Sequence, residues 1–194
     1  MRRVRQKRFE RLQKLADGPY AALAIQYARR FLARYPDHAL AWTLFGTTLV
    51  EIARYHEAEQ AFANALEFCP NGKRHIVLAY LGHMAREAGD YGQAASWYRK
   101  AIAAAPDDAG GHIFLGAVLA KQGRLSQVEA AHREATRCTY GCVDEAFHNL
   151  GLVLRAQERF EEAAECFREA IQLDPDYRAA RRALRDVELV VTKL

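Results

Sequence analysis

Two cysteines with nearby histidines form the most chemically suggestive group in the sequence. Cys138 and Cys142 are four residues apart, and His132 and His148 lie within ten residues of them. A structural zinc ion prefers four thiolate or imidazole ligands at short spacing, so a metal site or a regulatory disulfide is one hypothesis for this segment. The spacing matches neither a zinc ribbon nor a zinc finger. We therefore favour ordinary, partly buried thiols, and expect no bound metal.

No other group of residues resembles a catalytic site. The sequence has no Gly-rich phosphate loop, no nucleophile elbow and no HExxH pattern. His83 and Glu87 are one helical turn apart, but such pairs are usually solvated ion pairs. The remaining cysteines, Cys69 and Cys166, lie beside apolar residues and are expected to pack there. We expect no enzymatic activity and no cofactor.

Compartment and membrane attachment follow from the apolar segments and the cysteines. No stretch approaches the roughly 20 consecutive apolar residues that span a bilayer, and the N-terminus lacks the apolar core of a signal peptide. Four unevenly spaced cysteines do not suggest a disulfide framework and fit a reducing compartment. These features predict a cytoplasmic protein.

The N-terminus is strongly basic. Residues 1–14 contain seven Lys or Arg and one acidic residue, whereas the rest of the chain has 21 basic and 23 acidic residues. Such a segment can bind phosphates, so an RNA-binding helical repeat protein is our second functional hypothesis. However, Val4, Phe9, Leu12 and Leu15 give the segment an apolar stripe. We favour a terminal helix that buries this stripe and keeps its charges in water.

A spacing pattern shows which elements carry these residues. Glycine is followed by a small residue after 12 positions, an aromatic after 16, a small residue after 19 and proline after 24. Three copies are complete: Gly46, Ala58, Phe62, Ala65, Pro70; Gly82, Ala94, Tyr98, Ala101, Pro106; and Gly151, Ala163, Phe167, Ala170, Pro175. Two copies are degenerate: Gly116, Val128, His132, Ala135, Tyr140; and Leu12, Ala24, Ala28, Phe31, Pro36. A repeat of this length predicts a solenoid of stacked units.

Steric reasoning explains each position of the repeat. Steps of three and four place Ala58, Phe62 and Ala65 on one helical face, and Gly46 lets the preceding helix approach it closely. The aromatic side chain projects toward the next hairpin, and proline ends the second helix. The predicted helices span 4–16, 20–35, 38–53, 56–69, 73–88, 92–104, 108–122, 126–138, 142–157, 161–173 and 177–193.

These motifs resemble the tetratricopeptide repeat family, most closely in Trp42-Thr43-Leu44-Phe45-Gly46 and the four pattern residues that follow it. The resemblance implies an all-α, right-handed α-α superhelix of about five helical hairpins. The expected repeats are 5–38, 39–72, 75–108, 109–142 and 144–177, with 178–194 as a capping helix. In the family, first helices build a concave face that holds a segment of a partner protein, so the leading hypothesis is a protein-binding scaffold or assembly adaptor.

The repeat register predicts which side chains line this concave face. The expected groove residues are Thr43, Thr47, Tyr80, His83, Arg86, Ile113, Ala117, His148, Leu152 and Arg155. Some family members bind a C-terminal carboxylate with Lys and Asn side chains, and this sequence lacks them at the corresponding positions, which include Phe9, Gln13, Leu40 and Ile76. The expected partner is an apolar peptide or amphipathic helix with acidic residues.

The predicted capping helix has more apolar surface at its C-terminal end than covering one hairpin requires. Val187, Val191 and Leu194 continue its apolar stripe at helical spacing. A homodimer contact through this helix is therefore an alternative to capping alone.

Overall fold

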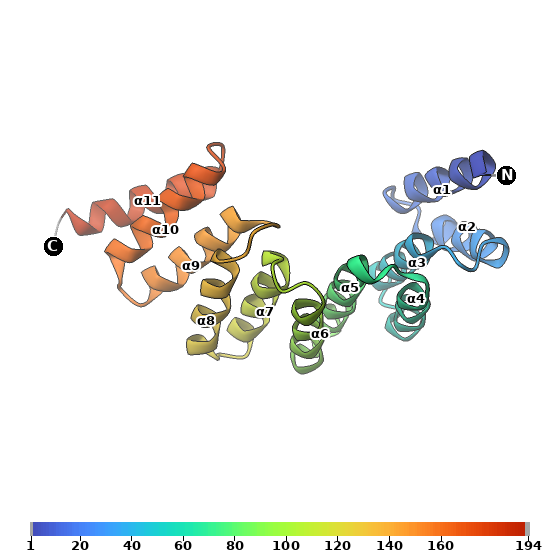
Figure 1. Ribbon diagram of the computed structural model, residues 1–194, viewed down its shortest axis with the longest axis horizontal. Helices are drawn as coiled ribbons and strands as arrows, with labels where there is room; N and C mark the ends of the chain where they lie inside the picture. The colour runs from blue at the N-terminus through green and yellow to red at the C-terminus, as the bar shows by residue number, and fades with distance from the viewer. Residues whose placement is uncertain (1, 193–194) are drawn as a thin grey trace. The chain divides into compact units, whose positions relative to one another are not determined.

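The computed structural model describes residues 2–192, and within them the chain forms eleven α-helices and one 3-10 helix (Figure 1). The helices are α1 (Arg2–Ala16), α2 (Ala21–Arg34), α3 (Ala39–Glu51), α4 (Tyr55–Phe68), η1 (Asn71–Lys73), α5 (Arg74–Glu87), α6 (Tyr91–Ala104), α7 (Ala109–Lys121), α8 (Leu125–Thr136), α9 (Val143–Ala156), α10 (Phe160–Leu173) and α11 (Arg178–Val191). The all-α fold class is confirmed. Each predicted helix end that the structure describes lies within two residues of the observed one, whereas residues 193 and 194 of the predicted last helix lie outside the described residues.

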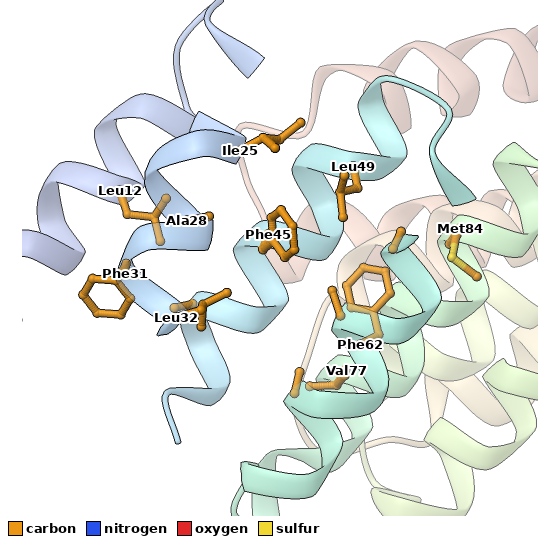
Figure 2. Packing of buried hydrophobic residues seen from close by; sticks show 14 of the residues in the cluster. Leu12, Ile25, Ala28, Phe31, Leu32, Phe45, Leu49, Phe62, Val77 and Met84 are labelled. Atoms are coloured by element: carbon orange, nitrogen blue, oxygen red, sulfur yellow. The ribbon is translucent and has the colours of Figure 1, made fainter. Parts of the chain in front are cut away.

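The chain divides into two compact units, Met1–Trp97 and Tyr98–Leu194, with the boundary inside α6. The core of the first unit is a cluster contributed by its first five α-helices (Figure 2). Leu12 of α1 and Leu49 of α3 are at most 1% exposed. Burial of such side chains is worth about 1.5–3 kcal/mol each, so packing between hairpins stabilises helices that would be marginal alone.

The glycine and aromatic positions of the repeat meet as predicted. A Cβ atom on Gly46 would lie 2.6 Å from Phe62 Cε1, and one on Gly151 would lie 2.6 Å from Phe167 Cε1. Phe62 and Phe167 are both 0% exposed. The aromatic ring therefore packs on the backbone of the preceding helix at a distance that only glycine allows.

In the second unit, a histidine takes the place of this aromatic ring. A Cβ atom on Gly116 of α7 would lie 2.6 Å from His132 Cε1, and His132 is 5% exposed. Its Nδ1 atom is buried without a hydrogen-bond partner, and burial lowers its pKa from 6.5 to about 4. His132 therefore packs as a neutral ring at pH 7, which agrees with the predicted core role.

The hairpin turns share one backbone requirement. Gly89 and Gly123 have φ angles of 81° and 71°, and the equivalent turn positions hold Ala53 and Glu158 at 58° and 61°. This left-handed conformation costs a non-glycine residue roughly 1–2 kcal/mol. The turn geometry is thus kept even where the sequence does not supply glycine.

Candidate binding groove

A hollow of about 320 Å³ lies in the first unit along α1, α3 and α5. Its lining residues are mostly apolar: Phe9, Gln13, Ala39, Leu40, Thr43, Leu44, Thr47, Cys69, Pro70, Lys73, Ile76, Val77 and Tyr80. These three helices are the first members of successive hairpins, and the loop between α4 and α5 supplies the rest of the lining. The geometry is therefore a groove along the first helices of one unit.

Three predicted groove residues, Thr43, Thr47 and Tyr80, line this hollow. The Thr43 hydroxyl donates to the Ala39 carbonyl at 3.1 Å, and the Thr47 hydroxyl donates to the Leu44 carbonyl at 3.0 Å. Because both hydroxyls have backbone partners, they leave little hydrogen-bonding demand in the groove. A ligand with apolar side chains therefore suits this wall better than a highly polar one.

The largest apolar side chains of the groove were absent from the predicted site. Leu40 is 58% exposed and Ile76 is 44% exposed, although both line the hollow. Each lies six residues before the repeat glycine, at Gly46 and Gly82. The prediction used positions three before, one after and four after the glycine. Adding the position one helical turn earlier would have found both residues.

Tyr80 is held by its neighbours on two elements. Its ring stacks on Phe62 of α4, with centroids 6.1 Å apart and an interplanar angle of 5°. The His83 ring lies 6.1 Å from it in an edge-on arrangement. Such aromatic contacts fix the ring, so Tyr80 gives the groove a rigid wall.

His83 and Arg86 lie farther along α5 and do not line the hollow. Burial, followed by the positive charge of Arg86, lowers the pKa of His83 to about 4, so the ring is neutral at pH 7. Arg86 forms an ion pair with Glu87 at 2.9 Å. Among the lining residues, Lys73 is instead the one with a positive charge, and its side chain is exposed.

The other five predicted residues lie in the second unit. Ile113 is 4% exposed and packs with Ala109, Ala135 and Ala146, so it belongs to the core of this unit and not to an open surface. Ala117, on the same helix, is exposed. That Ala117 lines a partner-binding surface stays a prediction.

The three predicted residues of α9 are partly buried. The His148 ring lies 5.8 Å from the Phe167 ring and 5.0 Å from the Tyr177 ring, which makes it a packing element within this unit. Leu152 packs against the core cluster of α9, α10 and α11, and Arg155 is half-buried. A binding role for these residues stays a prediction.

The segment from Cys138 to Cys142 is fixed by its backbone. The Thr139 and Tyr140 amides both donate to the Asp107 carbonyl, at 3.2 and 3.3 Å, and the Ala109 amide donates to the Tyr140 carbonyl at 3.1 Å. Burial and nearby acidic side chains raise the pKa of both thiols. Both cysteines are free, and they are therefore protonated and weakly reactive at pH 7.

Neither a metal-binding cluster nor a membrane span is present in residues 2–192. In this range no three His, Cys, Asp or Glu side chains gather in a way that could hold a metal ion. None of the helices in the same range is both long and apolar enough to cross a bilayer.

Helical hairpins in which a glycine packs under an aromatic ring, repeated at a period of 34–36 residues, define a tetratricopeptide-type repeat protein. Tetratricopeptide repeat models match residues 21–73 and 77–137, more than half of the chain, and residues 144–177. The chain belongs to the tetratricopeptide repeat family.

Two human proteins are similar to this chain in sequence. Tetratricopeptide repeat protein 7B is 29% identical over 133 residues, which cover 69% of this chain. Tetratricopeptide repeat protein 7A is 33% identical over 100 residues, which cover 52% of this chain. The matched segments span only 15% and 12% of these two relatives.

Solved structures show the same fold. YrrB, described as a TPR protein with an unusual peptide-binding site, has a TM-score of 0.59 and 23% identity, covering 90% of this chain and 88% of its own. MamA from residue 41, from Desulfovibrio magneticus RS-1, has a TM-score of 0.65 and 18% identity, covering 90% of this chain and 97% of its own. Repeats of this type commonly mediate protein–protein interactions.

Proposed function

We propose that the chain is a non-enzymatic interaction module that binds a polypeptide segment in the groove along α1, α3 and α5. The observation that carries this proposal is the exposure of large apolar side chains in a concave site. Leu40, Ile76 and Tyr80 are 58%, 44% and 36% exposed and line one hollow. Apolar surface of this kind in a groove is typical of a site that a partner covers.

The groove chemistry favours a particular kind of segment. Its apolar wall fits two or three aliphatic or aromatic side chains, and Lys73 at one end fits an acidic residue. The partner is therefore an amphipathic or apolar segment with at least one acidic side chain. YrrB, whose description names a peptide-binding site, shares the fold and supports a peptide as the ligand class.

Selection from a random peptide library tests the proposal for a partner of any sequence. The chain is immobilised, a phage-displayed library is selected on it, and affinities of the selected peptides are measured by fluorescence anisotropy. We expect peptides with spaced apolar residues and an acidic residue. Leu40→Asp and Ile76→Asp should each weaken binding about tenfold or more, because each side chain buries roughly 1.5–3 kcal/mol of apolar surface.

A matched variant controls for a general effect of the added charge. Leu173 of α10 is 53% exposed and does not line the groove, so Leu173→Asp should leave the affinity unchanged. Circular dichroism confirms that all variants keep their helicity. Equal loss of affinity in Leu173→Asp and Ile76→Asp would refute the proposal.

A further inference from the structure

A second hollow in the first unit is lined by positive charges instead of apolar side chains. It has a volume of about 480 Å³ and lies between α1 and α2. Its lining residues are Lys7, Arg8, Arg11, Tyr27, Arg30 and Phe31. None of them lines the apolar groove, so the two surfaces are separate.

The four cations of this hollow lack the acidic partners that arginines have elsewhere in the chain. Lys7, Arg8, Arg11 and Arg30 are all exposed, and none of them is in an ion pair within residues 2–192. By contrast, the neighbouring Arg29 pairs with Glu57 at 3.0 Å. The lining of the hollow contains no acidic residue.

This concentration of charge is unfavourable for the isolated chain. Lys7 and Arg11 are four residues apart on one helix, and like charges at that spacing repel each other. The adjacent hollow along α1 differs, because it contains Glu10, and its Arg5 pairs with Asp37 at 3.0 Å. An anionic ligand would relieve the repulsion that this chain leaves uncompensated between α1 and α2.

The floor of the hollow fixes one of the cations. The Arg11 guanidinium lies over the Tyr27 ring, 5.5 Å from its centroid, and Phe31 is 4% exposed. The cation–π contact holds Arg11 in place before a ligand arrives. Because Phe31 is buried and Tyr27 is covered by Arg11, neither ring offers a stacking platform for a nucleic-acid base.

From this arrangement we infer that the hollow between α1 and α2 binds a soluble ligand with two or more neighbouring phosphate groups. Arginine forks suit phosphate oxygens, and three of the four cations are arginines. Each phosphate monoester carries roughly −1.5 to −2 charges at pH 7, so two of them balance four cations. A single carboxylate would leave most of the positive charge uncompensated.

Inorganic tripolyphosphate is a suitable probe, titrated into the full 194-residue chain by calorimetry at physiological salt. We expect it to bind at least tenfold more tightly than sulfate. Arg11→Gln and Arg30→Gln should each weaken binding about tenfold, as expected for loss of a charge-assisted hydrogen bond. Arg29→Gln removes the same charge from the adjacent position of α2 and should change the affinity less than twofold.

Several results would overturn the inference. These are the absence of binding heat and of any tripolyphosphate-induced thermal shift, or an equal effect of Arg29→Gln and Arg30→Gln. A glutamate oligomer that binds more tightly than tripolyphosphate would assign the hollow to an acidic polypeptide instead. An RNA oligonucleotide whose affinity exceeds that of tripolyphosphate and rises with length would assign it to nucleic acid.

Discussion

Protonation of His132 should destabilise the folded chain in acid, and replacement by phenylalanine should remove this effect. His132 is 5% exposed, and its pKa is about 4 in the folded state compared with 6.5 for a solvated imidazole. Between these two values the unfolded chain binds more protons than the folded chain. Stability contributed by the neutral ring is therefore complete above pH 6.5 and is lost as the pH falls toward 4.

The two pKa values set the size of the effect. The full difference corresponds to roughly 3 kcal/mol, of which about 2 kcal/mol should be lost between pH 7 and pH 5. Phenylalanine should fit the site, because Phe62 and Phe167 make the same 2.6 Å approach to their repeat glycines that His132 makes to Gly116. His132→Phe should thus unfold with much less pH dependence than the wild type.

Urea denaturation followed by circular dichroism at pH 7, 6, 5 and 4.5 measures the free energy of unfolding of both proteins. The exposed imidazole of His56 supplies the control, and His56→Gln should keep the wild-type pH dependence. Parallel curves for the wild type and His132→Phe would refute the reasoning, because they would show that the buried ring does not titrate differently in the two states.

Two further predictions concern the backbone of the repeat. Gly151→Ala should lower the free energy of unfolding by about 1–3 kcal/mol in urea titrations, because its Cβ would overlap the Phe167 ring; Gly72→Ala, with no atom within 4 Å, should be nearly neutral. Ala53→Gly and Glu158→Gly should each raise the melting temperature by relieving about 1 kcal/mol of left-handed strain, and unchanged or lower values would show that these turns are not strained.

The fold was predictable because each repeat position has a local steric cause. The 16-residue interval from Gly46 to Phe62 and from Gly151 to Phe167 encodes a specific contact between paired helices, and the structure contains that contact. The interval also placed His132 in the core although histidine is not typical there. Spacing within one hairpin therefore predicted the packing of its two helices.

The groove was less predictable because exposure depends on which neighbours cover a helix. Thr43, Thr47 and Tyr80 were found from register alone, whereas Ile113, in an equivalent register, is covered by side chains of α8 and α9. The positive hollow was harder to foresee. The sequence shows the basic α1 segment, but only the antiparallel arrangement of α1 and α2 brings Arg30 next to it.

Photocrosslinking tests the proposed groove most directly. A peptide selected on the chain is incubated with two versions of it, one with benzoylphenylalanine in place of Ile76 and one with it in place of Leu173. Both positions are exposed, at 44% and 53%, but only the first lines the groove. The proposal predicts a peptide crosslink at position 76 and none at position 173, whereas a crosslink at position 173 alone would contradict it.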